Sequence, residues 1–142
     1  MAPRTPALLL AATLALTLLP AWADVVVIVS PHNPIASLTV EQAGDIFLGR
    51  LATFPGGSEA VPIDQSEGMP ARNAFYQKSI GKAPHQMKAY WARMIFTGRG
   101  QPPVESGDDA AIKRLVANNP NVIGYIDKGA LDGTVKPVLT LH

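Results

Sequence analysis

Apolar residues along the chain fall into short continuous runs and into stripes at helical spacing. The apolar, β-branched run at 25–29 predicts a buried central strand, and 60–63 predicts a second, shorter strand. The runs at 122–126 and 135–141 predict the final strands. Pro137 indicates that the last strand lies at a sheet edge, because proline cannot donate to a central hydrogen-bond ladder.

Local capping signals predict where the first two helices begin. Thr39 and Gln42 have the spacing of a capping box, so a helix should start at Val40. Pro70 suits the first position of a second helix, because its missing N–H costs nothing there. That helix should continue to Ile80 and end at the glycine that follows.

Two further helices follow in the second half of the chain. The third should begin near Pro84, and Asp108 should cap the fourth. Their expected buried stripes are Met87, Tyr90, Trp91, Met94 and Ile95 in the third helix, and Ile112, Leu115 and Val116 in the fourth. The order of strand, helix, strand, three helices and two strands predicts a single α/β domain, three-layer-like, with a mixed sheet.

The N-terminus has the organisation of a secretory signal. Arg4 precedes an apolar run at 8–19, and residues 21–23 (AWA) have the small-x-small pattern of a cleavage site. The run is too short for a membrane span, which needs about 20 residues. We therefore expect residues 1–23 to be removed, leaving 24–142 as a periplasmic domain without a membrane span.

The expected mature chain has a balanced charge. Eleven basic and eleven acidic residues remain after Arg4 is lost, and they are mixed along the chain, so no basic field is available for nucleic acid. The chain has no cysteine. Disulfides, thiolate metal ligands and a lipid anchor on an N-terminal cysteine are therefore excluded.

Candidate catalytic and metal-binding residues are sparse. His32, His85 and His142 are far apart in sequence, without an i, i+4 pair, so we expect no metal site. Ser30 with His32 lacks a third residue that would orient a nucleophile–base pair. We expect neither an enzyme nor a bound cofactor.

The turn between the second predicted strand and the second predicted helix is the best candidate binding site. A helix N-terminus offers unpaired N–H groups and a positive dipole end, which together favour oxyanions. Ser66 can donate a hydroxyl, Gly68 allows close approach, and Arg72 supplies a planar fork of donors. Against this, Glu67 brings a negative charge and Pro70 lacks an N–H. The alternative interpretation is an ordinary helix start with a solvated Arg72.

Three ordered segments resemble the phosphate-type substrate-binding proteins of ABC transporters. Residues 38–50 (LTVEQAGDIFLGR) resemble the family's L-[ST]-x-x-[QE]-x-x-x-I-F-x-G-[KR] helix, and 67–75 (EGMPARNAF) resemble its E-G-S-G-T-R-x-x-F loop. Residues 116–125 resemble its V-x-x-x-P-x-A-I-G-Y segment. The resemblance covers most of 25–127. It implies one lobe of a type II periplasmic binding protein plus the strand that crosses the hinge.

The departures from the family pattern concern the phosphate loop. Where the family places Ser, Gly and Thr around the phosphate oxygens, this chain has Met, Pro and Ala at 69–71. Of the residues that would contact the ligand, only Gly68 and Arg72 carry over from the family's binding loop, while Ser66 is a candidate from local chemistry. Loss of two or three charge-assisted hydrogen bonds, each worth about 1.5–3 kcal/mol, predicts a weak or degenerate phosphate site.

The resemblance also implies partners. A phosphate-type component would bind a small oxyanion and work with an ABC permease. The alternative is an exported accessory protein that has lost its ligand and presents an open face to a partner or to a second copy.

Overall fold

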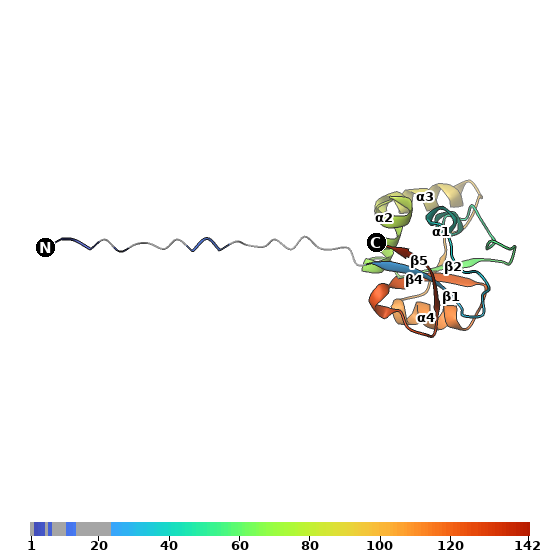
Figure 1. Ribbon diagram of the computed structural model, residues 1–142. Coiled ribbons are helices and arrows are strands. Elements are labelled where there is room, and N and C mark those ends of the chain that lie inside the picture. Colours follow the sequence, from blue (N-terminus) through green and yellow to red (C-terminus); the bar gives the residue numbers. More distant parts are fainter. Residues whose placement is uncertain (1, 5, 7–10, 14–23) are drawn as a thin grey trace.

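The computed structural model describes residues 2–4, 6, 11–13 and 24–142, so most of the predicted signal at 1–23 lies outside the described residues. A five-stranded sheet separates two helical layers (Figure 1). In chain order the elements are β1 (Val25–Val29), α1 (Val40–Phe47), β2 (Val61–Asp64), α2 (Pro70–Ile80), α3 (Pro84–Phe96), β3 (Val104–Glu105), α4 (Asp109–Ala117), β4 (Val122–Asp127), the short 3-10 helix η1 (Lys128–Ala130) and β5 (Lys136–Leu141).

The sheet is mixed, with the strand order β3-β2-β4-β1-β5. β1 pairs antiparallel with β4 and β5, whereas β2 pairs parallel with β3 and β4. Every residue of β1 is at most 1% exposed, which confirms the predicted inner strand. β5 lies at one edge and contains Pro137, also as predicted. β3 was not predicted, because both of its residues are exposed and the strand has no apolar pattern.

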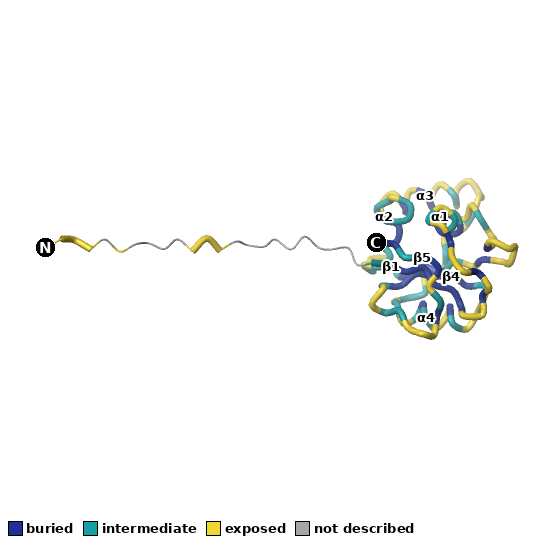
Figure 2. Tube along the Cα trace, viewed as in Figure 1, coloured by how far each residue is buried: buried dark blue, intermediate teal, exposed yellow. Residues whose placement is uncertain are grey.

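Each face of the sheet has its own hydrophobic cluster. The strands β1 and β4 between the two clusters are buried along nearly their whole length (Figure 2). Helices α1, α2 and α3 cover one face, where Phe75 stacks on Tyr125 with ring centroids 4.2 Å apart. Helix α4 covers the other face through Ile112 and Val116. The predicted α/β domain with three layers and a mixed sheet is therefore confirmed.

The helix boundaries follow their local signals. Thr39 and Gln42 form the reciprocal capping box at the start of α1, and Asp108 accepts a hydrogen bond from the Ala111 amide at the start of α4. Helix α2 begins at Pro70 and ends against Gly81, which has a left-handed φ of 72°. None of the helices in the described part of the chain has the length and apolar character needed to cross a bilayer.

Two residues of the predicted buried stripes are in fact exposed. Ile95 in α3 and Leu115 in α4 each have 47% of their surface exposed, so their predicted burial is wrong. Helix α3 buries only Met87, Tyr90 and Trp91. The apolar stripe of α3 therefore extends beyond the part of the helix that is buried.

Candidate functional site

The candidate loop lies at the carboxyl edge of the parallel strands. β2 ends at Asp64, and α2 begins at Pro70 after a turn that includes Ser66 and Gly68. Gly68 has a φ of 88°, a left-handed conformation that favours glycine. The structure thus brings all three predicted ligand residues, Ser66, Gly68 and Arg72, to one turn and the first helical turn after it.

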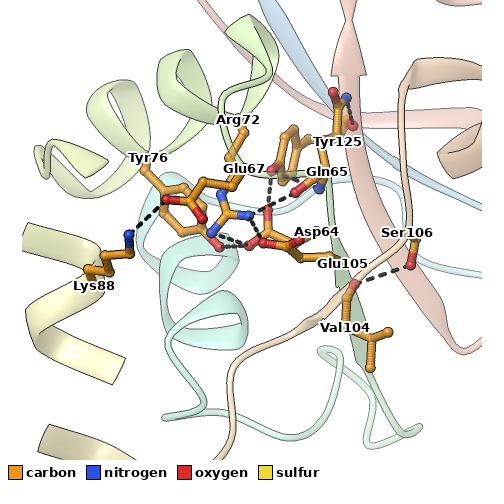
Figure 3. Close-up of polar contacts among 10 residues, drawn as sticks. All are labelled: Asp64, Gln65, Glu67, Arg72, Tyr76, Lys88, Val104, Glu105, Ser106 and Tyr125. Atoms are coloured by element: carbon orange, nitrogen blue, oxygen red, sulfur yellow. Dashed lines mark hydrogen bonds and ion pairs between the residues drawn. The ribbon is translucent and has the colours of Figure 1, made fainter. Parts of the chain in front are cut away.

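The guanidinium of Arg72 points toward acidic groups of the chain itself (Figure 3). Its Nη1 donates to Glu105 Oε1 at 2.6 Å and to the Gln65 carbonyl oxygen at 2.9 Å. Its Nη2 lies 3.9 Å from Asp64 Oδ2, and the side chain is 21% exposed. Burial opposes the charge of Arg72, but Asp64 and Glu105 outweigh it and raise the pKa of the guanidinium. Arg72 is therefore not the solvated side chain of the alternative interpretation.

Asp64 is a buried carboxyl surrounded by donors. It is 2% exposed, and its oxygens accept hydrogen bonds from the Tyr76 hydroxyl at 2.6 Å and from the Tyr125 hydroxyl. Burial raises the pKa of Asp64, although the hydrogen bonds from Tyr125 and Tyr76 and the charge of Arg72 lower it. Burial and the neighbouring Asp64 also raise the pKa of both tyrosines, so the phenols keep their protons and donate.

Several backbone donors of the turn already have partners. The Ser66 amide donates to the Gly107 carbonyl at 3.0 Å, and the Met69 amide donates to the Ser66 carbonyl at 3.1 Å. Pro70, the first residue of α2, has no N–H. Glu67 lies in the turn itself, with its carboxylate 3.1 Å from Lys88 Nζ, and Lys88 lowers the pKa of this carboxylate. The N-terminus of α2 consequently offers an anion few donors and an adjacent negative charge.

Sequence reasoning missed the partners of Arg72. Glu105 lies 33 positions away on a strand of two exposed residues, which leaves no pattern to read. Asp64 had a signal, since it is a charged residue at the end of an apolar strand. Its neighbour Gln65 is fully buried and donates through Nε2 to Asp109 Oδ1 at 2.7 Å. The Gln65 Oε1 is the one buried side-chain polar atom without a partner among the described residues.

The histidines are spread over separate parts of the molecule. His32 and His85 are exposed on different segments, and His142 Nδ1 lies 3.3 Å from Asp24 Oδ2. Within residues 24–142 and the short described stretches before them, no group of three or more His, Cys, Asp or Glu side chains is placed to hold a metal ion.

Comparison with known proteins finds similarity to this chain among solved structures. No protein-family model and no curated protein sequence matches it. Among solved structures, an ABC-type phosphate transport receptor from Vibrio cholerae matches with a TM-score of 0.64 at 19% identity, over 82% of this chain and 46% of that one. A putative phosphate ABC transporter substrate-binding protein from Clostridium perfringens, solved with bound phosphate, matches with a TM-score of 0.61 at 28% identity, over 82% and 45%.

A third match extends the same resemblance. A possible phosphate binding protein from Planctomyces limnophilus has a TM-score of 0.59 at 13% identity, over 82% of this chain and 42% of that one. The chain thus spans less than half the length of these three structures. The resemblance to phosphate-type substrate-binding proteins, shortened to about one lobe, is confirmed at the level of the fold.

Proposed function

We propose that this protein is a periplasmic, solute-binding-type component related to phosphate ABC transport, with a degenerate ligand site. The proposal assumes export by the signal at 1–23. The structural similarity to phosphate-type proteins supports the relation to transport. The observation that carries the degenerate site is the engagement of Arg72 by Glu105 and Asp64. An incoming oxyanion must compete with two carboxylates that already contact this cation.

The electrostatics of the turn support weak binding of phosphate or another small oxyanion. Arg72 is one positive charge set against Asp64 and Glu105, and Glu67 adds a further acid next to Gly68. Like charges placed this close disfavour a bound anion. The segment 69–71 (MPA) supplies no side-chain hydroxyl to offset that repulsion. We expect phosphate to bind with a Kd in the millimolar range or weaker.

The engagement of Arg72 by Glu105 and Asp64 also supports an accessory role in the same system. The structural match covers less than half the length of each of these neighbours. An ABC permease is the expected partner, and a second copy of this chain is the alternative. If phosphate binding is lost altogether, the accessory role is the one that remains.

Calorimetric titration with inorganic phosphate tests the proposal. Wild type should give weak heat, and Arg72→Ala should abolish it. Glu105→Gln should strengthen binding by up to about tenfold, or about 1.4 kcal/mol, because it removes the closest competing carboxylate. Glu59→Gln, an exposed acid on a separate loop, serves as the matched control and should change nothing.

Two results decide between the roles. Tight, micromolar phosphate binding that survives Arg72→Ala would contradict both the degenerate site and its location. The absence of heat in wild type and in Glu105→Gln would favour the accessory role without a ligand. Sedimentation at several protein concentrations then shows whether a second copy is the partner.

A further inference from the structure

A groove of about 690 Å³ lies beside the Arg72 cluster, between α2, α3 and the segment 101–105. We call it the α3 groove. Its volume lies within the range of about 300–1,000 Å³ that is typical of small-molecule sites. Phosphate is far smaller than this space, so the α3 groove suits a larger ligand than the degenerate turn does.

The walls of the α3 groove are mainly apolar. Met87 and Trp91 line it from the buried side of α3, and Trp91 is 8% exposed. Ile95 and Val104, which are 47% and 71% exposed, line it closer to solvent. Two of the large exposed apolar side chains of the described chain therefore face one concave site that already contains an indole ring. This is the composition of a pocket for an apolar or aromatic group.

The charged residues of the α3 groove differ in whether they already have a partner. Its acids are engaged, since Glu67 pairs with Lys88, while Glu105 and Asp64 contact Arg72. Lys82 also lines the groove, and its ammonium contacts no acid or other polar group of the described residues. The one uncommitted charge among the described lining residues is therefore positive.

We propose that the α3 groove binds an organic anion with an apolar, preferably aromatic, body and a single negatively charged group. The body packs against Trp91, Ile95 and Val104, and the charged group pairs with Lys82. Charge complementarity selects the anion, and the apolar walls select the body. The α3 groove adjoins the degenerate turn and shares Arg72 and its acids with it. The proposed ligand is held by other residues, so its binding and that of phosphate are tested by different variants.

A matched pair of dyes tests the proposal on the full chain carrying Trp22→Phe, in which Trp91 is the remaining tryptophan. The anionic probe is 1-anilinonaphthalene-8-sulfonate, and the neutral probe is N-phenyl-1-naphthylamine, which has the same rings without the sulfonate. Both should bind and quench Trp91 emission by energy transfer. The sulfonate should bind at least about fivefold more tightly, or about 1 kcal/mol, because it pairs with Lys82.

Variants locate the site and separate the contribution of its apolar lining from that of Lys82. Ile95→Asp should weaken both dyes at least tenfold, whereas Leu115→Asp, with the same 47% exposure on α4, should leave both unchanged. Lys82→Gln should reduce the affinity for the sulfonate to that for the neutral dye. Arg114→Gln, an exposed cation on α4, is its charge control.

Two results would overturn the proposal. If Ile95→Asp and Leu115→Asp have equal effects, or if Trp91 is not quenched, the α3 groove is not the binding site. If Lys82→Gln leaves the ratio of the two affinities unchanged, the ligand is not an anion held at Lys82. If Ile95→Asp lowers the unfolding midpoint, Val104→Asp in the exposed strand β3 is used in its place to test the apolar lining.

Discussion

Arg72 shows, for a single residue, why a motif match does not establish a binding site. The sequence places an arginine at the family's position in the loop. The folded chain then surrounds its guanidinium with the Glu105 carboxylate, the Gln65 carbonyl and the Asp64 carboxylate. A donor that already has strong acceptors contributes less to binding an external anion, because each contact with the anion replaces an existing one.

Asp64 is the residue whose replacement should change the pH dependence of stability. Burial raises its pKa in the folded protein. The contribution of Asp64 to the free energy of unfolding is therefore complete at pH values below its pKa in the unfolded chain, about 3.9. It is lost as the pH rises through its pKa in the folded protein. The advantage of wild type over Asp64→Asn in free energy of unfolding should be largest near pH 4 and shrink toward pH 7. Urea unfolding across this range measures it.

Asp132 provides a control, because its contribution to stability should have the opposite pH dependence. Hydrogen bonds from Thr134 and Lys113 lower its pKa to about 2. A carboxylate whose pKa is lowered by folding stabilises the folded protein at pH values above its pKa in the unfolded chain. This stabilisation is lost as the pH falls toward about 2. The advantage of wild type over Asp132→Asn should therefore grow with rising pH between 2 and 5. An Asp64→Asn series that follows this same trend would contradict the burial argument.

Among the elements, the contact between α4 and the sheet depends on the absence of a side chain at Gly124 in β4. A Cβ at this position would lie 2.6 Å from Ile112 Cγ2 and 3.3 Å from Val116 Cγ2. Both neighbours are fully buried, so they have little room to move. The absence of a side chain at Gly124 therefore allows α4 to pack closely against the sheet.

Gly124→Ala should destabilise the fold by about 1–3 kcal/mol, the usual cost of overpacking a core. Gly133→Ala is the matched control, because nothing lies within 4 Å of its added Cβ and its backbone is not left-handed. Urea unfolding of the two variants beside wild type gives the comparison. Equal midpoints for Gly124→Ala and Gly133→Ala would show that α4 shifts to accept the methyl group.

For the whole molecule, the described structure is consistent with a domain that begins at Asp24. β1 starts at the next residue, and the Lys128 amide donates to the Asp24 carbonyl at 2.9 Å. The chain beginning at Asp24 should therefore unfold in one cooperative transition, with a midpoint within about 2 °C of that of the full chain. A midpoint clearly below that of the full chain would show that residues 1–23 take part in the fold.

Expression in a bacterial host tests the export signal directly. The mature protein should be recovered from the periplasm, and its mass should correspond to residues 24–142. Ala23→Arg should block processing, because the cleavage site requires a small residue there. Recovery of an uncleaved wild-type chain from the membrane fraction would instead indicate an anchor.

The features that could be predicted from the sequence are those whose cause is local. The capping box of Thr39 and Gln42, the proline at the start of α2 and the Asp108 cap involve groups at most three or four positions apart. The apolar run of β1 likewise carries its own evidence of burial on both faces. Such signals depend on the backbone hydrogen bonds and side chains of one element, so they can be read before the tertiary fold is known.

The features that only the tertiary structure decided are contacts between distant segments. Glu105 reaches Arg72 across 33 positions, and Tyr125 reaches Asp64 across 61. The parallel pairing of β2 with β3 and β4 makes these contacts, and no local pattern encodes which strands become neighbours. The sequence could therefore identify the loop, whereas the charge balance within it depended on which acids the completed sheet placed beside one guanidinium.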